Sequence, residues 1–195
     1  MKRVIAQMCA ADSKRVLASV LACREKAEIE DLVQRAQPSR SAQPLLSQEL
    51  VRLGSKSRSK EEAMQEIVDA FYIAGRTEDR QQMEEALWLR EAAYPTGVDY
   101  GFAIPHCKTE AVTADSVGVL KLSQPIDWGS ASSQPVNMVI LMAMRGPHAG
   151  NRHLQVLSKL CRKLEEEEFR GHLLAAENAH DMVAYLAQEL EVSLH

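Results

Sequence analysis

Val136-Asn137-Met138-Val139-Ile140-Leu141-Met142-Ala143-Met144 is the stretch that decides the fold, because Asn137 alone interrupts its run of apolar residues. A strand covered on one face alternates apolar with polar residues, whereas a strand buried on both faces is continuously apolar. We therefore predict a central strand over residues 136–144 with helices on both of its faces. The run is much too short for a membrane-spanning helix, which needs about 20 apolar residues.

Three further strands are predicted around this central strand. They cover residues 50–53, 101–104 and 117–122, which are short and mostly apolar segments. Segments with helical periodicity lie before, between and after these strands. This order predicts an α/β fold, specifically a three-layer α/β/α sandwich around a mixed β-sheet.

Two helices precede the predicted strand at residues 101–104. Ser59-Lys60-Glu61-Glu62 is a capping box and Gly75 is a stop signal, so the first helix lies between them. Its buried face is predicted to contain Ala63, Ile67, Ala70 and either Phe71 or Ala74. The second helix is predicted from about Asp79 to Glu91, and its buried face contains Met83, Leu87 and one side of Trp88.

Three helices are predicted after the central strand. The first begins near Asn151, and apolar residues spaced three and four apart are expected to face inward: Leu154, Leu157, Cys161 and Leu164. Two shorter helices are predicted over residues 169–175 and 179–190. Together the helices that flank the strands supply the two outer layers of the sandwich.

The N-terminal part of the chain differs from the rest. Residues 1–36 have helical periodicity, and residues 37–45 are polar and contain two prolines, which is typical of a linker. The predicted organisation is therefore an N-terminal helical appendage over 1–36, a linker over 37–45 and an α/β domain over 46–193.

Charge and composition limit the kinds of partner. The chain has 195 residues, 26% of them charged, and a formal net charge of −4 at pH 7. It lacks the basic surface of a nucleic-acid-binding protein, and binding to an anionic membrane is not favoured. Gln7, Asp12 and Lys14 interrupt what would be the apolar core of a signal peptide, so a cytoplasmic protein is expected.

The segment Gly101-Phe102-Ala103-Ile104-Pro105-His106 contains the main candidate for chemistry. A histidine that accepts a phosphoryl group must be unprotonated near neutral pH, which imidazole satisfies with an ordinary pKa of about 6.5. An arginine can hold two phosphoryl oxygens with its planar fork, and a second histidine can donate a hydrogen bond. Arg90 and His153 are of these types, but their spacing alone does not show that they meet His106.

Other chemistries are less favoured by the residue pattern. Cys107 adjoins His106 and is conceivable as a thiol nucleophile, but it lacks a supporting motif. His148 and His153 are five residues apart, which is not the spacing of a helical zinc pair. No metal and no organic cofactor are expected.

The segments Arg90-Glu91, Pro95-Thr96-Gly97 and Ala103-Ile104-Pro105-His106 resemble the active-site signature of the sugar phosphotransferase system enzyme IIA domain, fructose–mannitol type. The resemblance extends over about residues 46–192 and includes Pro125-Ile126-Asp127-Trp128-Gly129. It implies that His106 is the phosphorylated residue. It also implies that Arg90, and His153 at the start of His153-Leu154-Gln155-Val156-Leu157, flank His106. Thr96 either contributes a hydroxyl to the phosphoryl group or shapes the turn.

The same resemblance implies a phosphocarrier function. His106 would accept a phosphoryl group from the phosphohistidine of the carrier protein HPr and pass it to a cysteine of a IIB domain. The chain would then contact a membrane only through the IIB/IIC permease, and the sugar is expected to be fructose-like. An exposed apolar rim formed by Val98, Phe102 and Ile104 is expected to receive these partners.

Two alternatives remain open at the level of sequence. In one, the chain is a regulatory protein of the nitrogen-related branch, in which phosphorylation of His106 controls binding to other proteins. In the other, it is a remnant of a fused polyprotein. Residues 1–36 resemble the C-terminal end of an enzyme I-type domain, as in multiphosphoryl transfer proteins where that domain precedes a IIA domain.

Overall fold

The computed structural model describes residues 43–130, 134–146 and 152–192. The helical segment expected over residues 1–36 and most of the linker expected over 37–45 lie outside these described residues. The α/β domain begins at Pro44, and its first strand begins two residues later. No helix in the described ranges is long and apolar enough to cross a membrane.

A mixed six-stranded sheet forms the middle of the domain. Its order is β1-β5-β6-β3-β2, and β4 also pairs with β6. The strands β1 and β5 are parallel, β5 and β6 are antiparallel, and β3 and β4 both run parallel to β6. The strand bounds are β1 (Leu46–Ser55), β2 (Gly97–Val98), β3 (Phe102–Ala103), β4 (His106–Thr109), β5 (Ser116–Ile126) and β6 (Val136–Arg145).

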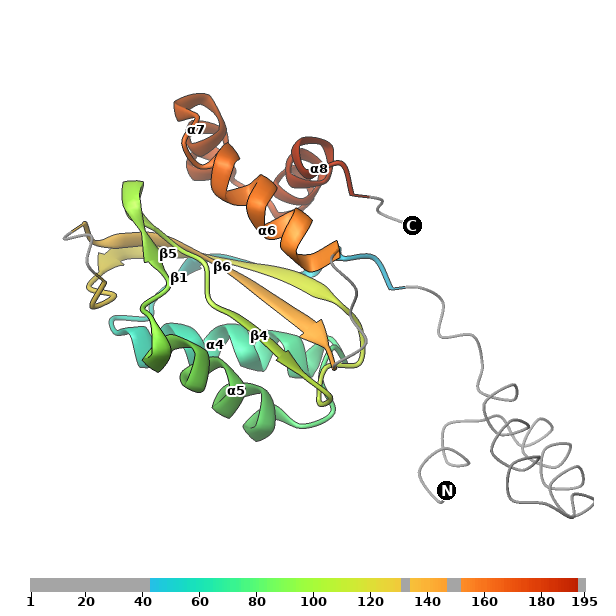
Figure 1. The fold of residues 1–195 in the computed structure, drawn as a ribbon. Helices are drawn as coiled ribbons and strands as arrows, with labels where there is room; N and C mark the ends of the chain where they lie inside the picture. The colour runs from blue at the N-terminus through green and yellow to red at the C-terminus, as the bar shows by residue number, and fades with distance from the viewer. Residues whose placement is uncertain (1–42, 131–133, 147–151, 193–195) are drawn as a thin grey trace, which may run out of the picture. The chain divides into compact units, whose positions relative to one another are not determined.

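Helices cover both faces of this sheet, as Figure 1 shows. On one face lie α4 (Lys60–Ile73) and α5 (Arg80–Ala93); on the other lie α6 (Arg152–Lys163), α7 (Glu167–Ala175) and α8 (Ala179–Leu190). The predicted three-layer α/β/α sandwich is therefore confirmed.

The continuous apolar run of β6 is explained by these two layers. Met138, Ile140 and Met142 belong to the apolar cluster shared with α6, α7 and α8. Val139 and Leu141, between them, belong to the cluster shared with α4 and α5. Because successive side chains of a strand point to opposite faces, a strand with helices on both sides needs apolar residues at every position.

The two helices that carry part of the site begin where their caps predict. The Ser59 side chain accepts a hydrogen bond from the backbone N–H of Glu62 at 3.2 Å, and Asp79 caps α5 by accepting from Gln82 at 3.0 Å. Gly75, with a φ of +67°, follows the end of α4. The second helix extends two residues beyond the predicted end, to Ala93, and Arg90 and Glu91 remain in its last turn.

The buried face of α6 differs from the predicted one. Val156 and Leu160 are buried, whereas Leu154 and Cys161 are exposed. Leu164, which directly follows the helix, is buried as predicted. Leu157 is partly buried and lies at the boundary between the two faces. Spacings of three and four residues fit two overlapping stripes on this helix, and only packing against the sheet selects the one that is buried.

Candidate functional site

His106 is the first residue of β4, a short strand that the sequence did not predict. It pairs with Met142 of β6, and the preceding Pro105 separates β4 from β3. Proline has no N–H to donate, but the Pro105 carbonyl accepts a hydrogen bond from the Met142 N–H at 3.0 Å. His106 is therefore fixed to a buried strand through its backbone, while its side chain is partly exposed.

The two ring nitrogens of His106 have different partners. Nδ1 lies 3.0 Å from the carbonyl oxygen of Ile104, and Nε2 lies 2.9 Å from Nε of Arg90. A carbonyl can only accept and a guanidinium can only donate, so Nδ1 carries the proton and Nε2 accepts. The ring is thus held as a neutral imidazole with the Nε2 lone pair directed at Arg90.

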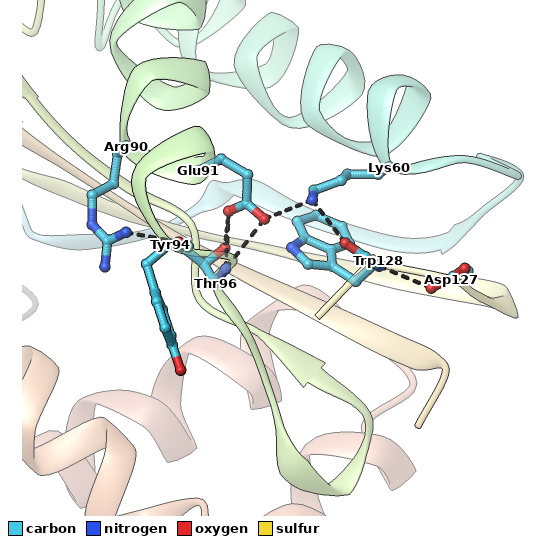
Figure 2. Close-up of polar contacts among 8 residues, drawn as sticks. Lys60, Arg90, Glu91, Tyr94, Thr96, Asp127 and Trp128 are labelled. Carbon is cyan, nitrogen blue, oxygen red and sulfur yellow. Dashed lines mark hydrogen bonds and ion pairs between the residues drawn. The ribbon is translucent and has the colours of Figure 1, made fainter. Parts of the chain in front are cut away.

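Arg90 reaches His106 from the last turn of α5. Its Nε donates to His106, and its Nη1 donates to the carbonyl of Tyr94 at 2.8 Å. Figure 2 shows the guanidinium beyond the end of the helix, beside Tyr94. The structure therefore brings together two of the three residues that the resemblance placed at the site.

His153, the third of these residues, is the second residue of α6, but its side chain lies outside the described part of the chain, as does His148. Its convergence on His106 stays a prediction. The strand β4 pairs with β6 alone among the described strands, so His106 lies on an edge strand of the sheet.

Thr96 is buried and is bound to Glu91. Its hydroxyl donates to Glu91 Oε2, and its backbone N–H lies 3.2 and 3.1 Å from the two carboxylate oxygens. Since the hydroxyl proton is directed at a carboxylate, this arrangement favours the second role considered for Thr96, that of shaping the turn.

Glu91 and Lys60 belong to the segments quoted above but had no predicted role at the site, yet they lie at the centre of this region (Figure 2). Lys60 Nζ is 2.7 Å from Glu91 Oε1 and donates to the Trp128 carbonyl, also at 2.7 Å. Glu91 follows Met83 and Leu87 at helical spacing, so its place on the buried stripe of α5 was visible in the sequence.

Cys107 does not fit the role of a nucleophile. It is buried, and it packs within the apolar cluster shared with α4 and α5. Burial raises the pKa of the Cys107 thiol to about 12, so the thiol stays protonated at neutral pH. Within the described ranges, no group of three or more His, Cys, Asp or Glu side chains could hold a metal ion.

The exposed apolar surface beside the site differs from the expected rim. Phe102 and Ile104 are buried in the core instead of forming a surface. Leu89 and Tyr94, on either side of Arg90 in the chain, are exposed by 75% and 68%. Because strand residues alternate between faces, Phe102 and Ile104 point into the layer of α6 to α8 and cannot line an exposed rim.

Comparison with known proteins identifies the family. Residues 44–189 match the family model described as phosphoenolpyruvate-dependent sugar phosphotransferase system, EIIA 2. The chain belongs to this family. Among the curated relatives, it is 33% identical over 191 residues to multiphosphoryl transfer protein 2 of Escherichia coli strain K12, covering 98% of this chain and 23% of that protein. The chain thus spans about a quarter of the length of that relative.

A second relative is close to this domain in length. The fructose-specific EIIA component of the Haloferax volcanii phosphotransferase system is 35% identical over 144 residues, covering 73% of this chain and 92% of that protein. The family match over residues 44–189 corresponds to the α/β domain that contains His106 and Arg90.

Solved structures share the fold. The nitrogen regulatory protein IIA-Ntr of Neisseria meningitidis superposes with a TM-score of 0.68 at 24% identity, covering 73% of this chain and 96% of that one. The complex of enzyme IIAMTL with phosphorylated enzyme IIBMTL from Escherichia coli contains a chain with a TM-score of 0.61 at 25% identity, covering 73% and 97%. At 24% identity, the first of these likenesses concerns the fold alone.

Proposed function

We propose that this protein is a phosphocarrier in which His106 accepts a phosphoryl group from the phosphohistidine of HPr and passes it to a cysteine of a IIB domain. The observation that carries the proposal is the pair of contacts at the ring of His106. The Ile104 carbonyl holds Nδ1–H, and Arg90 lies against the Nε2 lone pair. This arrangement presents one defined nucleophilic nitrogen next to a permanent cation.

The transfer step uses Nε2 as the nucleophile. Its lone pair forms a bond to phosphorus while the P–N bond of the donor phosphohistidine breaks, and the electron pair of that bond returns to the donor imidazole. The ring of His106 keeps its Nδ1 proton and becomes positively charged. The Ile104 carbonyl, 3.0 Å from Nδ1, stabilises that charge through the same hydrogen bond.

Arg90 must change its partner during this step, because the lone pair that attacks phosphorus is the one that now accepts from Arg90 Nε. The guanidinium can turn to the phosphoryl oxygens, where the negative charge is spread in the transition state. Its second contact, from Nη1 to the carbonyl of Tyr94 at 2.8 Å, keeps it beside the ring meanwhile. His153, in the first turn of α6, is proposed as a further donor to the phosphoryl group.

The proposed partners are proteins, and the sugar does not contact this chain. The exposed side chains of Leu89 and Tyr94 offer apolar surface for them next to Arg90. A IIB acceptor is supported by the solved mannitol complex of IIA with phosphorylated IIB, and a fructose-like sugar by the fructose-specific relative. Contact with a membrane would occur only through the IIB/IIC permease, and the protein would act in the cytoplasm.

Residues 1–36 are proposed to correspond to the C-terminal end of an enzyme I-type domain. The match to multiphosphoryl transfer protein 2 extends over 98% of the chain and therefore includes most of this segment as well as the α/β domain. None of the residues proposed for phosphoryl transfer lies in this segment, so its removal is not expected to abolish labelling of His106.

The function is tested by incubating the protein with phosphoenolpyruvate, enzyme I and HPr and measuring an acid-labile, base-stable phosphate on it. His106→Ala should abolish the label, whereas the matched control His180→Ala, at an exposed position on α8, should retain it. Full labelling of His106→Ala would overturn the assignment. The labelled protein is then mixed with a purified IIB domain: transfer to IIB supports the carrier function, and its absence favours the regulatory alternative.

A further inference from the structure

The carboxylate of Glu91 is a buried junction between three parts of the fold. The residue is only 4% exposed, and it lies in the last turn of α5 directly after Arg90. Lys60 at the start of α4 reaches it at 2.7 Å. The N–H and the hydroxyl of Thr96 donate to it from the turn that follows α5.

From this junction, a continuous series of hydrogen bonds leads to Nδ1 of His106. The carbonyl of Thr96, whose other polar groups are held by Glu91, accepts from the Ile104 N–H at 2.9 Å. The Ile104 carbonyl in turn accepts from Nδ1–H at 3.0 Å. The position of the Ile104 carbonyl, which accepts the Nδ1 proton of His106, therefore depends on the position in which Glu91 fixes Thr96.

A second path leads from the same junction to Nε2. Arg90 directly precedes Glu91 on α5, and its Nη1 donates to the Tyr94 carbonyl. Tyr94 belongs to the same turn as Thr96, whose N–H donates to Glu91. The Nε of Arg90 then donates to Nε2 of His106. The partners of both ring nitrogens are thus anchored to the one turn, residues 94–96.

We propose that Glu91, with Lys60 as its counter-ion, is a positioning residue that fixes the tautomer of His106 and the reach of Arg90. This inference rests on the proposed function, since it assigns the junction a part in phosphoryl transfer at His106. Glu91 acts through Thr96, Ile104 and Arg90 and does not itself touch the phosphoryl group.

The chemistry of a carboxylate suits this position and an amide does not. An ionised carboxylate only accepts, so its two oxygens can serve the Thr96 N–H, the Thr96 hydroxyl and the Lys60 ammonium together. In Glu91→Gln, one terminal group is an NH2 donor, which must face one of these donors. The turn is then expected to shift, and with it the Ile104 carbonyl and the Tyr94 carbonyl.

The test compares Glu91→Gln with Glu85→Gln, a matched control on an exposed position of the same helix. Nitrogen-15 spectra of the unphosphorylated proteins report which ring nitrogen of His106 carries the proton. Rapid-quench experiments with phosphorylated HPr then report the rate of transfer. Urea unfolding of each variant shows what fraction of the protein is folded under the assay conditions.

For Glu91→Gln we expect a mixture of tautomers in place of the single Nδ1–H form, and transfer slowed by about 10- to 100-fold per folded molecule, the scale for misplacing a reacting group. Lys60→Met, which removes the counter-ion of Glu91, should also slow transfer. Lys60→Arg keeps a positive charge at this position and should retain most of the rate of the unsubstituted protein. The Glu85→Gln control should match the unsubstituted protein in both measurements.

The inference is overturned if Glu91→Gln keeps a single Nδ1–H tautomer and a normal rate while the unsubstituted protein is phosphorylated at His106. It is also overturned if the rate falls only in proportion to the folded fraction, because Glu91 would then serve stability alone. Failure of the proposed function would look different: the unsubstituted protein would show the Nδ1–H tautomer but would take no label at His106.

Discussion

Replacing Arg90 by alanine is predicted to slow phosphoryl transfer without unfolding the domain. Arg90 makes two hydrogen bonds, at 2.9 Å to His106 Nε2 and at 2.8 Å to the Tyr94 carbonyl. Both acceptors belong to residues that are at least partly exposed, so water can replace the guanidinium at each. We therefore expect the free energy of unfolding to fall by about 1 kcal/mol at most.

The effect on the rate should be larger than the effect on stability. Arg90 donates at 2.9 Å to the nitrogen that attacks phosphorus, so its loss removes a contact that strengthens as charge moves onto the phosphoryl oxygens. Removing one such donor costs about 3 kcal/mol of activation free energy, or roughly 100-fold in rate. Arg90→Lys keeps the charge but loses the fork that joins two acceptors, and we expect roughly a tenfold loss.

The assay is a single-turnover, rapid-quench measurement of the label passed from phosphorylated HPr at saturating concentration. Saturation separates slower chemistry from weaker docking, which matters because the exposed Leu89 and Tyr94 flank Arg90. The reasoning is refuted if Arg90→Ala transfers within threefold of the unsubstituted rate. It is equally refuted if Arg90→Lys and Arg90→Ala are slowed to the same extent, because the fork would then contribute nothing beyond the charge.

Two further predictions concern the core and the thiols. A Cβ at Gly118 would lie 2.4 Å from a ring carbon of Phe71 and 3.2 Å from the Leu50 carbonyl, so Gly118→Ala should destabilise the domain by about 1–3 kcal/mol. A thermal midpoint unchanged within error would contradict that packing. Because burial raises the pKa of the Cys107 thiol to about 12 and the thiolate is the reactive form, its alkylation in the folded protein at pH 8 should be at least ~100-fold slower than in urea. Peptide mass spectrometry measures this against the exposed Cys161, and equal rates for the two folded thiols would show the prediction to be wrong.

The elements that the sequence predicts well are those with local signals. The run over residues 136–144 is apolar at almost every position, and β6 occupies Val136–Arg145. Ser59 and Asp79 each cap the helix they were expected to begin, because capping involves residues only three apart in the chain. Such local signals do not depend on contacts with distant parts of the chain, which is why the predictions made from them agree with the structure.

The elements that the sequence misses depend on contacts between distant segments. The strand β2 has two residues and β4 has four, which is too short for any periodicity to be detected, whereas β3 lies within the strand predicted over residues 101–104. They exist because β6 pairs with β3 and β4, and β3 in turn pairs with β2. The proximity of Arg90 and His106 is of the same kind: it followed from the family resemblance, and spacing alone did not predict it.

Glu91 shows how a correct pattern can still be misinterpreted. It stands four residues after Leu87 and eight after Met83, on the buried stripe of α5, yet a charged residue at that position is normally assigned to solvent. Burial of such a residue requires a partner, and here the partners come from α4 and from the following turn. A charged residue on an apolar stripe is therefore a signal of a buried polar junction.

Pro105 links these observations to the chemistry of the ring. Phe102 pairs with Met138 and His106 with Met142, so β3 and β4 follow one register along β6 with Ile104 and Pro105 between them. The Ile104 N–H donates to the Thr96 carbonyl, which continues the antiparallel register of the β2–β3 pair by one residue. In a regular antiparallel pair the Thr96 N–H would donate to the Ile104 carbonyl, but here it donates to Glu91. The Ile104 carbonyl is therefore left to accept the Nδ1 proton of His106, and the Nε2 lone pair points toward Arg90.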